Sequence, residues 1–276
     1  MNNDKTYRNA FILVTTLFFT WGFLTVLVDS PISRFREIFT LSYFESGLVQ
    51  FAFFGAYFLL SIPAGYILTR IGYQKGIILG LVTMAIGCFL FYPAASLRMF
   101  GLFMLGYFIL AGGMTILQVA ANPYVAALGS EETSSSRLIL SQAFNSLGTA
   151  IAPSVGAIYF LSDKILSKEE IDLLDVKSRD LYYIGEASAV QGPFIFFGCF
   201  LIAIAMVFFF VKLPPLMSEK ESGTFLDAIT QKNLIYGVFG IFFYVGAEVA
   251  IGSYLVNYFL DMNLVELIQN NSIMNS

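Results

Sequence analysis

Residues 100–127 read FGLFMLGYFILAGGMTILQVAANPYVAA, and no charged side chain occurs among them. The core of a lipid bilayer is about 30 Å thick, so a helix needs roughly 20 apolar residues to cross it. This stretch meets that requirement and predicts a membrane-spanning helix. Two amides, Gln118 and Asn122, interrupt the apolar run in its C-terminal half.

Six other blocks have the same character, and the whole chain is 57% hydrophobic and 12% charged. Soluble domains are roughly 45–50% apolar and about 25% charged, so a soluble fold would have to expose much of this apolar surface to water. We therefore expect an all-α integral membrane protein with about seven transmembrane helices in the lipid bilayer. The blocks are 9–29, 47–69, 76–97, 100–127, 138–162, 191–212 and 233–260.

The composition excludes several classes of protein. The chain has no histidine, which removes histidine-based acid–base catalysis and most zinc sites. Its net charge is −4 without basic clusters, so we expect no nucleic-acid partner. Cys88 and Cys199 lie in apolar blocks, where they are expected to pack as small hydrophobes. No Gly-x-Ser-x-Gly motif and no paired intramembrane acids occur, so we expect neither an enzyme nor a bound metal.

The orientation in the membrane follows from the lysines and arginines between the blocks. A cytoplasmic N-terminus places slightly more of them inside than outside, and clearly more when the long acid-rich segment 163–190 is set aside. The polar start Met1–Arg8 precedes an apolar block too long for a signal peptide. We expect a retained first helix, a cytoplasmic N-terminus and a multi-pass protein of the plasma membrane.

Amides inside two consecutive blocks are the strongest functional signal. Gln118 and Asn122 are four residues apart, so they share one helical face, and Pro123 is expected to kink that helix. Gln142 and Asn145 form a similar stripe in the next block. One interpretation is that the amides only bond neighbouring helices. The other is that they line a cavity for a hydroxyl-rich ligand, because an amide both donates and accepts hydrogen bonds.

Carboxylates within apolar blocks are costly and mark function by default. Asp29 ends the first block, where it is either solvated at the membrane surface or faces a cavity and carries a proton. Glu248 lies in the middle of the last block and either remains a neutral packed acid or serves as a proton or ligand site. Asn257 lies nine residues further on, on a similar helical face.

Several motifs, taken in order, resemble the major facilitator superfamily, and within it the fucose:proton symporter family, which includes bacterial glucose/galactose permeases. The resemblance covers nearly the whole chain. The matching segments are Pro63-Ala64-Gly65 with Gly72-Tyr73, Ala120 to Val125 with Leu128-Gly129, Arg137-Leu138 with Gln142 to Gly148, Tyr244 to Glu248, and Ser253 to Val256.

The resemblance implies twelve helices in two six-helix halves, with the sugar bound between them. Residues 1–212 would form the N-terminal half, 213–232 a cytoplasmic linker, and 233–276 the first helix of a truncated second half. It also implies a role for Asp29 in proton coupling or sugar binding. Fucose permeases carry a glutamate where this chain has Gln118, and this departure favours glucose or galactose. Thr69 replaces an acid that is usual in the superfamily.

These observations together predict a secondary active transporter for proton-coupled uptake of a neutral hexose or deoxyhexose (glucose/galactose or fucose). The proton is the coupling ion, no other cofactor is expected, and the full-length protein is expected to be monomeric. The alternative is a truncated, non-functional fragment of such a permease. The residues expected to couple protons are Asp29 and Glu248, and those expected to bind sugar are Gln118, Asn122, Gln142, Asn145 and Asn257.

Overall fold

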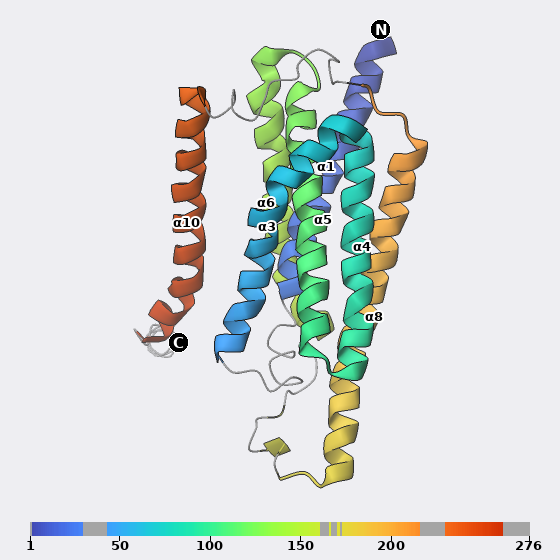
Figure 1. The fold of residues 1–276 in the computed structure, drawn as a ribbon, viewed down its shortest axis with the longest axis vertical. Coiled ribbons are helices and arrows are strands. Elements are labelled where there is room, and N and C mark those ends of the chain that lie inside the picture. Colours follow the sequence, from blue (N-terminus) through green and yellow to red (C-terminus); the bar gives the residue numbers. More distant parts are fainter. Residues whose placement is uncertain are drawn as a thin grey trace, which may run out of the picture. The chain divides into compact units, whose positions relative to one another are not determined.

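The computed structural model describes residues 2–29, 43–160, 166, 170–171, 173–215 and 230–261. They belong to two compact units, Met1–Met217 and Ser218–Ser276, which are treated separately below. The described residues are helical apart from short connections, and seven long α-helices occur among them, as predicted (Figure 1). In the first unit these are α1 (Asn2–Asp29), α3 (Tyr43–Ile71), α4 (Tyr73–Leu97), α5 (Phe100–Ala127), α6 (Ser134–Phe160) and α8 (Val176–Phe210), and in the second α10 (Lys232–Asp261). A short 3-10 turn, η1 (Glu131–Thr133), precedes α6.

Five of the described helices contain stretches that are long and apolar enough to cross a membrane. They are Thr6–Leu27, Phe51–Ile71, Tyr73–Leu97, Phe100–Ala127 and Val176–Phe210. α6 is 27 residues long and α10 is 30, so both exceed the length needed for a span. α6 is more polar than its neighbours because it carries serines, Gln142 and Asn145. The chain is therefore built as a multi-pass membrane protein.

In the first unit α4 packs against both α5 and α8, while α3 packs on α5 and α1 packs on α6 (Figure 1). Aromatic side chains fill the centre of this packing. Phe91 of α4 stacks on Phe194 of α8 at 4.2 Å between ring centroids, and it meets Phe103 of α5 edge to face. Such pairs stabilise a core beyond the area they bury.

Glycines allow two of these helix pairs to approach closely. A Cβ atom at Gly113 of α5 would lie 2.5 Å from the backbone nitrogen of Met84 in α4. A Cβ atom at Gly148 of α6 would lie 2.4 Å from the carbonyl oxygen of Phe19 in α1. Membrane helices associate through such close contacts because lipid supplies no hydrophobic driving force between them.

α8 begins earlier than the sequence suggested. Residues 176–190 were expected to belong to a long polar connection, but they form the first turns of this helix. Asp175 occupies the N-cap position, and no glycine or proline interrupts the helix before Gly185. Hydropathy finds only the apolar part of a helix, whereas here more polar residues form the start of the same helix.

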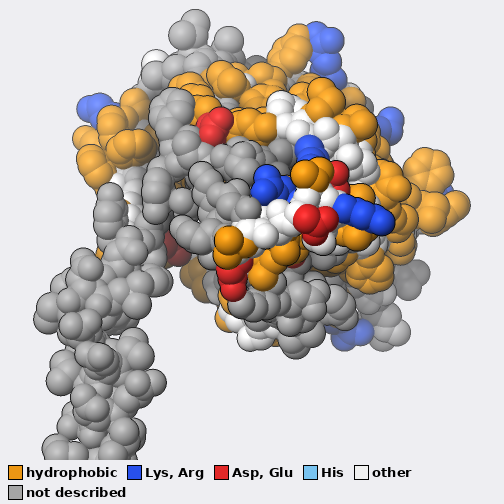
Figure 2. Space-filling model, turned by 90° about the horizontal axis from the view of Figure 1, so that it is seen from below, with side chains coloured by type: hydrophobic (Ala, Val, Ile, Leu, Met, Phe, Trp, Pro, Cys, Tyr) orange, Lys and Arg blue, Asp and Glu red, His pale blue; other side chains and the backbone are white. Residues whose placement is uncertain are grey.

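On the face seen from below, charged side chains gather near the middle and hydrophobic ones lie around them (Figure 2).

Candidate functional site

The four predicted amides of α5 and α6 are all half-buried, and each contacts a neighbouring helix. Gln118 of α5 donates a hydrogen bond from Nε2 to the hydroxyl of Tyr57 in α3, at 2.9 Å. Gln142 of α6 donates from Nε2 to Oδ1 of Asn122 in α5, at 3.5 Å. The structure thus brings residues of both predicted stripes together where α5 packs on α6.

Asn145 points to a different neighbour. Its Nδ2 donates to the carbonyl oxygen of Phe18 in α1, at 3.0 Å. One turn earlier on α6, the hydroxyl of buried Ser141 lies 3.2 Å from that of Thr15 in α1. These contacts join α6 to α1 at the same interface as the Gly148 contact. Asn145 therefore has a structural role between helices, whatever else it binds.

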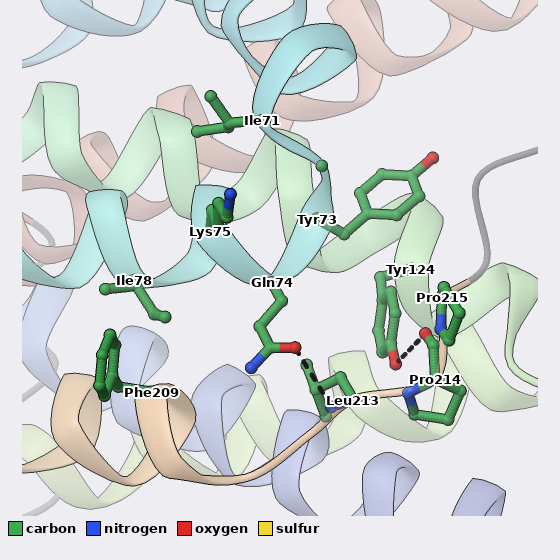
Figure 3. Close-up of a pocket in the computed structure, with 11 residues that line it drawn as sticks. Ile71, Tyr73, Gln74, Lys75, Ile78, Tyr124, Phe209, Leu213, Pro214 and Pro215 are labelled. Carbon is green, nitrogen blue, oxygen red and sulfur yellow. Dashed lines mark hydrogen bonds between the residues drawn. The ribbon is translucent and has the colours of Figure 1, made fainter. Parts of the chain in front are cut away.

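A cavity of about 410 Å³ lies away from the amides, at the turn between α3 and α4 (Figure 3). None of the predicted sugar-binding residues lines it. Gln74 donates to the carbonyl oxygens of Phe208 and Val211 at 2.7 Å each, and accepts from the Leu213 N–H at 3.2 Å. The Tyr124 hydroxyl donates to the carbonyl oxygen of Pro214 at 3.1 Å. The cavity walls thus fix the segment that follows α8.

Comparison with known proteins identifies the family. The family model of the Major Facilitator Superfamily matches residues 10–270. The chain belongs to the major facilitator superfamily.

Relatives within the superfamily carry names of sugar transporters. A glucose/galactose transporter of Brucella abortus biovar 1 (strain 9-941) is 44% identical, over 96% of this chain and 62% of the relative. An L-fucose-proton symporter of Escherichia coli (strain K12) is 35% identical, over 92% of this chain and 60% of the relative. The crystal structure of an E. coli fucose:proton symporter matches with a TM-score of 0.83 at 32% identity, over 92% of this chain and 63% of that one. The chain thus spans about three-fifths of the length of these relatives.

The remaining predicted residues of this superfamily member belong to the second unit or have side chains outside the described residues. Asp29 is the last residue of α1, and its side chain lies outside the described residues. Glu248 is exposed on α10 within the second unit. Asn257 belongs to α10, and its side chain also lies outside the described residues. In the described part of the chain, no group of three or more His, Cys, Asp or Glu is placed to hold a metal ion.

Sequence reasoning missed Tyr57, the partner of Gln118. The chain has 15 tyrosines, and most tyrosines in membrane helices pack or lie at the interface. Tyr57 carries no strong signal that distinguishes it from these. A weak signal was available, because a polar hydroxyl in the middle of the apolar segment 51–60 requires a partner.

Proposed function

We propose that this chain forms part of a proton-coupled transporter of a neutral hexose or deoxyhexose. The observation that carries the proposal is the contact between Gln142 and Asn122, together with Gln118 on the same helix as Asn122. Three half-buried amides in two adjoining apolar helices exceed what helix packing requires. The names of the relatives support the same substrate class.

The chemistry of the amides suits a sugar. Each carboxamide has two N–H donors and a carbonyl acceptor. Gln118 and Gln142 each use one donor bond to a neighbouring side chain, which leaves further donor and acceptor capacity for hydroxyl groups. Because the amides are uncharged, they match a neutral polyol better than an ionic substrate. The neutral side chain of Gln118 and the higher identity to a glucose/galactose transporter favour glucose or galactose over fucose.

The coupling ion is proposed to be a proton carried by Asp29, with Glu248 as the corresponding group of the second half. Residues 1–212 would then act as one half of the transporter, 213–232 as its cytoplasmic linker and 233–276 as the start of the other half. We further propose a cytoplasmic N-terminus, residence in the bacterial inner membrane and a monomeric full-length protein. Asn257 would contribute to the sugar site from the second half.

Equilibrium binding of a small sugar panel to the purified chain tests the proposal. We expect D-glucose or D-galactose to bind, and Gln142→Ala and Asn122→Ala each to weaken binding by about tenfold, since each removes groups that bond hydroxyls. Gln191→Ala is the matched control, because that amide bonds Tyr92 and Ser96 on α4 instead. Failure of the unsubstituted chain to bind any sugar contradicts the proposal and favours the inactive alternative.

Proton coupling has its own test. The sugar affinity of the chain should change with pH, and Asp29→Asn should abolish this dependence, because the amide cannot take up a proton. The measurement is the sugar affinity of the unsubstituted chain and of Asp29→Asn across the pH range. An unchanged pH profile in Asp29→Asn would exclude this aspartate as the coupling group, while leaving sugar binding intact.

A further inference from the structure

Tyr57 has a firmly held ring. It is half-buried on α3, and its ring centroid lies 5.3 Å from that of Phe53, which is buried. Phe53 in turn packs against Tyr107 of α5 at 5.6 Å. The aromatic side chain therefore extends from the hydrophobic core, and its oxygen is held at a defined place beside α5.

The hydroxyl of Tyr57 accepts a hydrogen bond from the amide of Gln118. Nε2 of Gln118 donates to this oxygen at 2.9 Å. The nitrogen and oxygen of a carboxamide point in different directions, so holding Nε2 at Tyr57 directs Oε1 elsewhere. Among the described residues, Oε1 of Gln118 has no hydrogen-bond partner. A fixed, half-buried acceptor without a partner is suited to receive a hydroxyl from a ligand.

We propose that Tyr57 is a positioning residue that sets specificity, because it holds Gln118 as a hydrogen-bond acceptor for one hydroxyl of the bound sugar. This inference rests on the proposed function. In this orientation of the amide, that sugar position donates its hydrogen to Oε1 of Gln118. Without the Tyr57 hydroxyl, the amide can rotate and offer either its N–H or its oxygen, so total affinity changes little while discrimination at that position falls.

A panel of deoxyfluoro sugars separates a change in total affinity from a change in discrimination at one sugar position. Fluorine replaces a hydroxyl group but cannot donate a hydrogen bond. For the full chain we expect one position at which fluorine weakens equilibrium binding by about tenfold, the effect of losing one well-placed hydrogen bond. In Tyr57→Phe this penalty should fall to about twofold. The penalty at the same position should also disappear in Gln118→Leu, and adding Tyr57→Phe to that variant should change nothing more.

Tyr66→Phe is the control, since it removes a hydroxyl from the same helix where the partner is Arg70 rather than an amide. The Tyr66→Phe variant should keep the tenfold loss of affinity for the fluorinated sugar. A tenfold penalty that persists in Tyr57→Phe or in Gln118→Leu overturns the assignment while the proposed function stands. Absence of sugar binding by the unsubstituted chain overturns both. Gln118→Leu keeps the test decisive if Tyr57→Phe does not fold.

Discussion

The amide of Asn145 makes a hydrogen bond whose acceptor is backbone rather than side chain. Its Nδ2 reaches the carbonyl oxygen of Phe18 at 3.0 Å, across the interface between α6 and α1. In a bilayer, interhelical hydrogen bonds of this kind contribute about 0.6 kcal/mol on average and up to about 1.7 kcal/mol. Asn145 therefore serves helix association directly.

Asn145→Ala should lower the stability of the folded chain by about 1 kcal/mol, because the bond to α1 is lost. Thermal unfolding in detergent measures the change. Ser146→Ala is the control, since Ser146 is an exposed neighbour on the same helix. Equal stability of the two variants would show that the bond to Phe18 contributes nothing.

The residues of the candidate site could be predicted from the sequence only in part. The polar groups themselves were predictable, because Gln118, Asn122, Gln142 and Asn145 stand out against apolar neighbours. Their partners were not predictable. Which group an amide meets depends on how two helices rotate and slide against each other, and the sequence of one helix carries little of that information. Tyr57 and the backbone of Phe18 became visible only with the packing in place.

At the scale of helices, the contact between α1 and α6 depends on the absence of a side chain at Gly148. A Cβ atom there would lie 2.4 Å from the Phe19 oxygen and 2.8 Å from the Phe23 nitrogen. Both are backbone atoms, so relief requires the helices to separate.

Gly148→Ala should destabilise the chain by about 1–3 kcal/mol through overpacking. Gly55→Ala on α3 is the matched control, because no atom lies within 4 Å of its added Cβ. In an open helical position this second substitution should be neutral or stabilising by up to about 1 kcal/mol. Thermal unfolding of both variants measures the difference, and similar destabilisation in both would argue against the close contact.

The start of α8 provides a pH-dependent prediction. A side-chain hydrogen bond with Ser178 is the main cause that lowers the pKa of Asp175, assisted by backbone N–H groups of the first turn. The ionised form therefore stabilises this helix end fully above the ordinary pKa of aspartate, and the stabilisation is lost as the pH falls through the lowered pKa.

A carbon-13 NMR titration of the Asp175 carboxyl group should place its pKa below the ordinary value. Ser178→Ala should move this pKa upward, since the hydroxyl donor is gone. Ser130→Ala, in the connection before η1, should leave it unchanged. An ordinary pKa of Asp175 in the unsubstituted chain would contradict the interaction with Ser178.

The helices themselves were largely predictable, since apolar blocks of bilayer length leave few alternatives. For α5 even both ends agree, at Phe100 and Ala127. The start of α8 differed by 15 residues from the apolar block, because its first turns are polar and fall outside any hydropathy signal.

At the scale of the molecule, the chain leaves α8 along a fixed path. Gln74 bonds the backbone of Phe208, Val211 and Leu213. The Leu213 bond, and the bond from Tyr124 to Pro214, are drawn in Figure 3. The turn between α3 and α4, together with Tyr124 of α5, therefore fixes the path of the residues that directly follow α8. We regard this as a structural anchor.

Gln74→Ala should make trypsin cleave after Lys212 at least about tenfold faster, because the hydrogen bonds that hold the residues on both sides of Lys212 are lost. Lys212 is already exposed, so local opening rather than access to the side chain limits cleavage. Timed digestion followed by mass spectrometry measures the rate. Gln191→Ala is the control, and an equal rate in both variants would mean that Gln74 does not restrain the segment.

The pairing of α1 with α6 also bears on biosynthesis. About a hundred residues separate the end of α1 at Asp29 from the start of α6 at Ser134. At about 5–20 residues per second, the ribosome needs about 5–20 s to make them. During that interval the Phe18 carbonyl oxygen has no Asn145 amide to accept from. The surface at Gly22, where an added Cβ atom would lie 2.2 Å from the Asn145 carbonyl oxygen, also lacks its eventual neighbour on α6. Lipid or the insertion machinery must therefore cover this surface until α6 has been made.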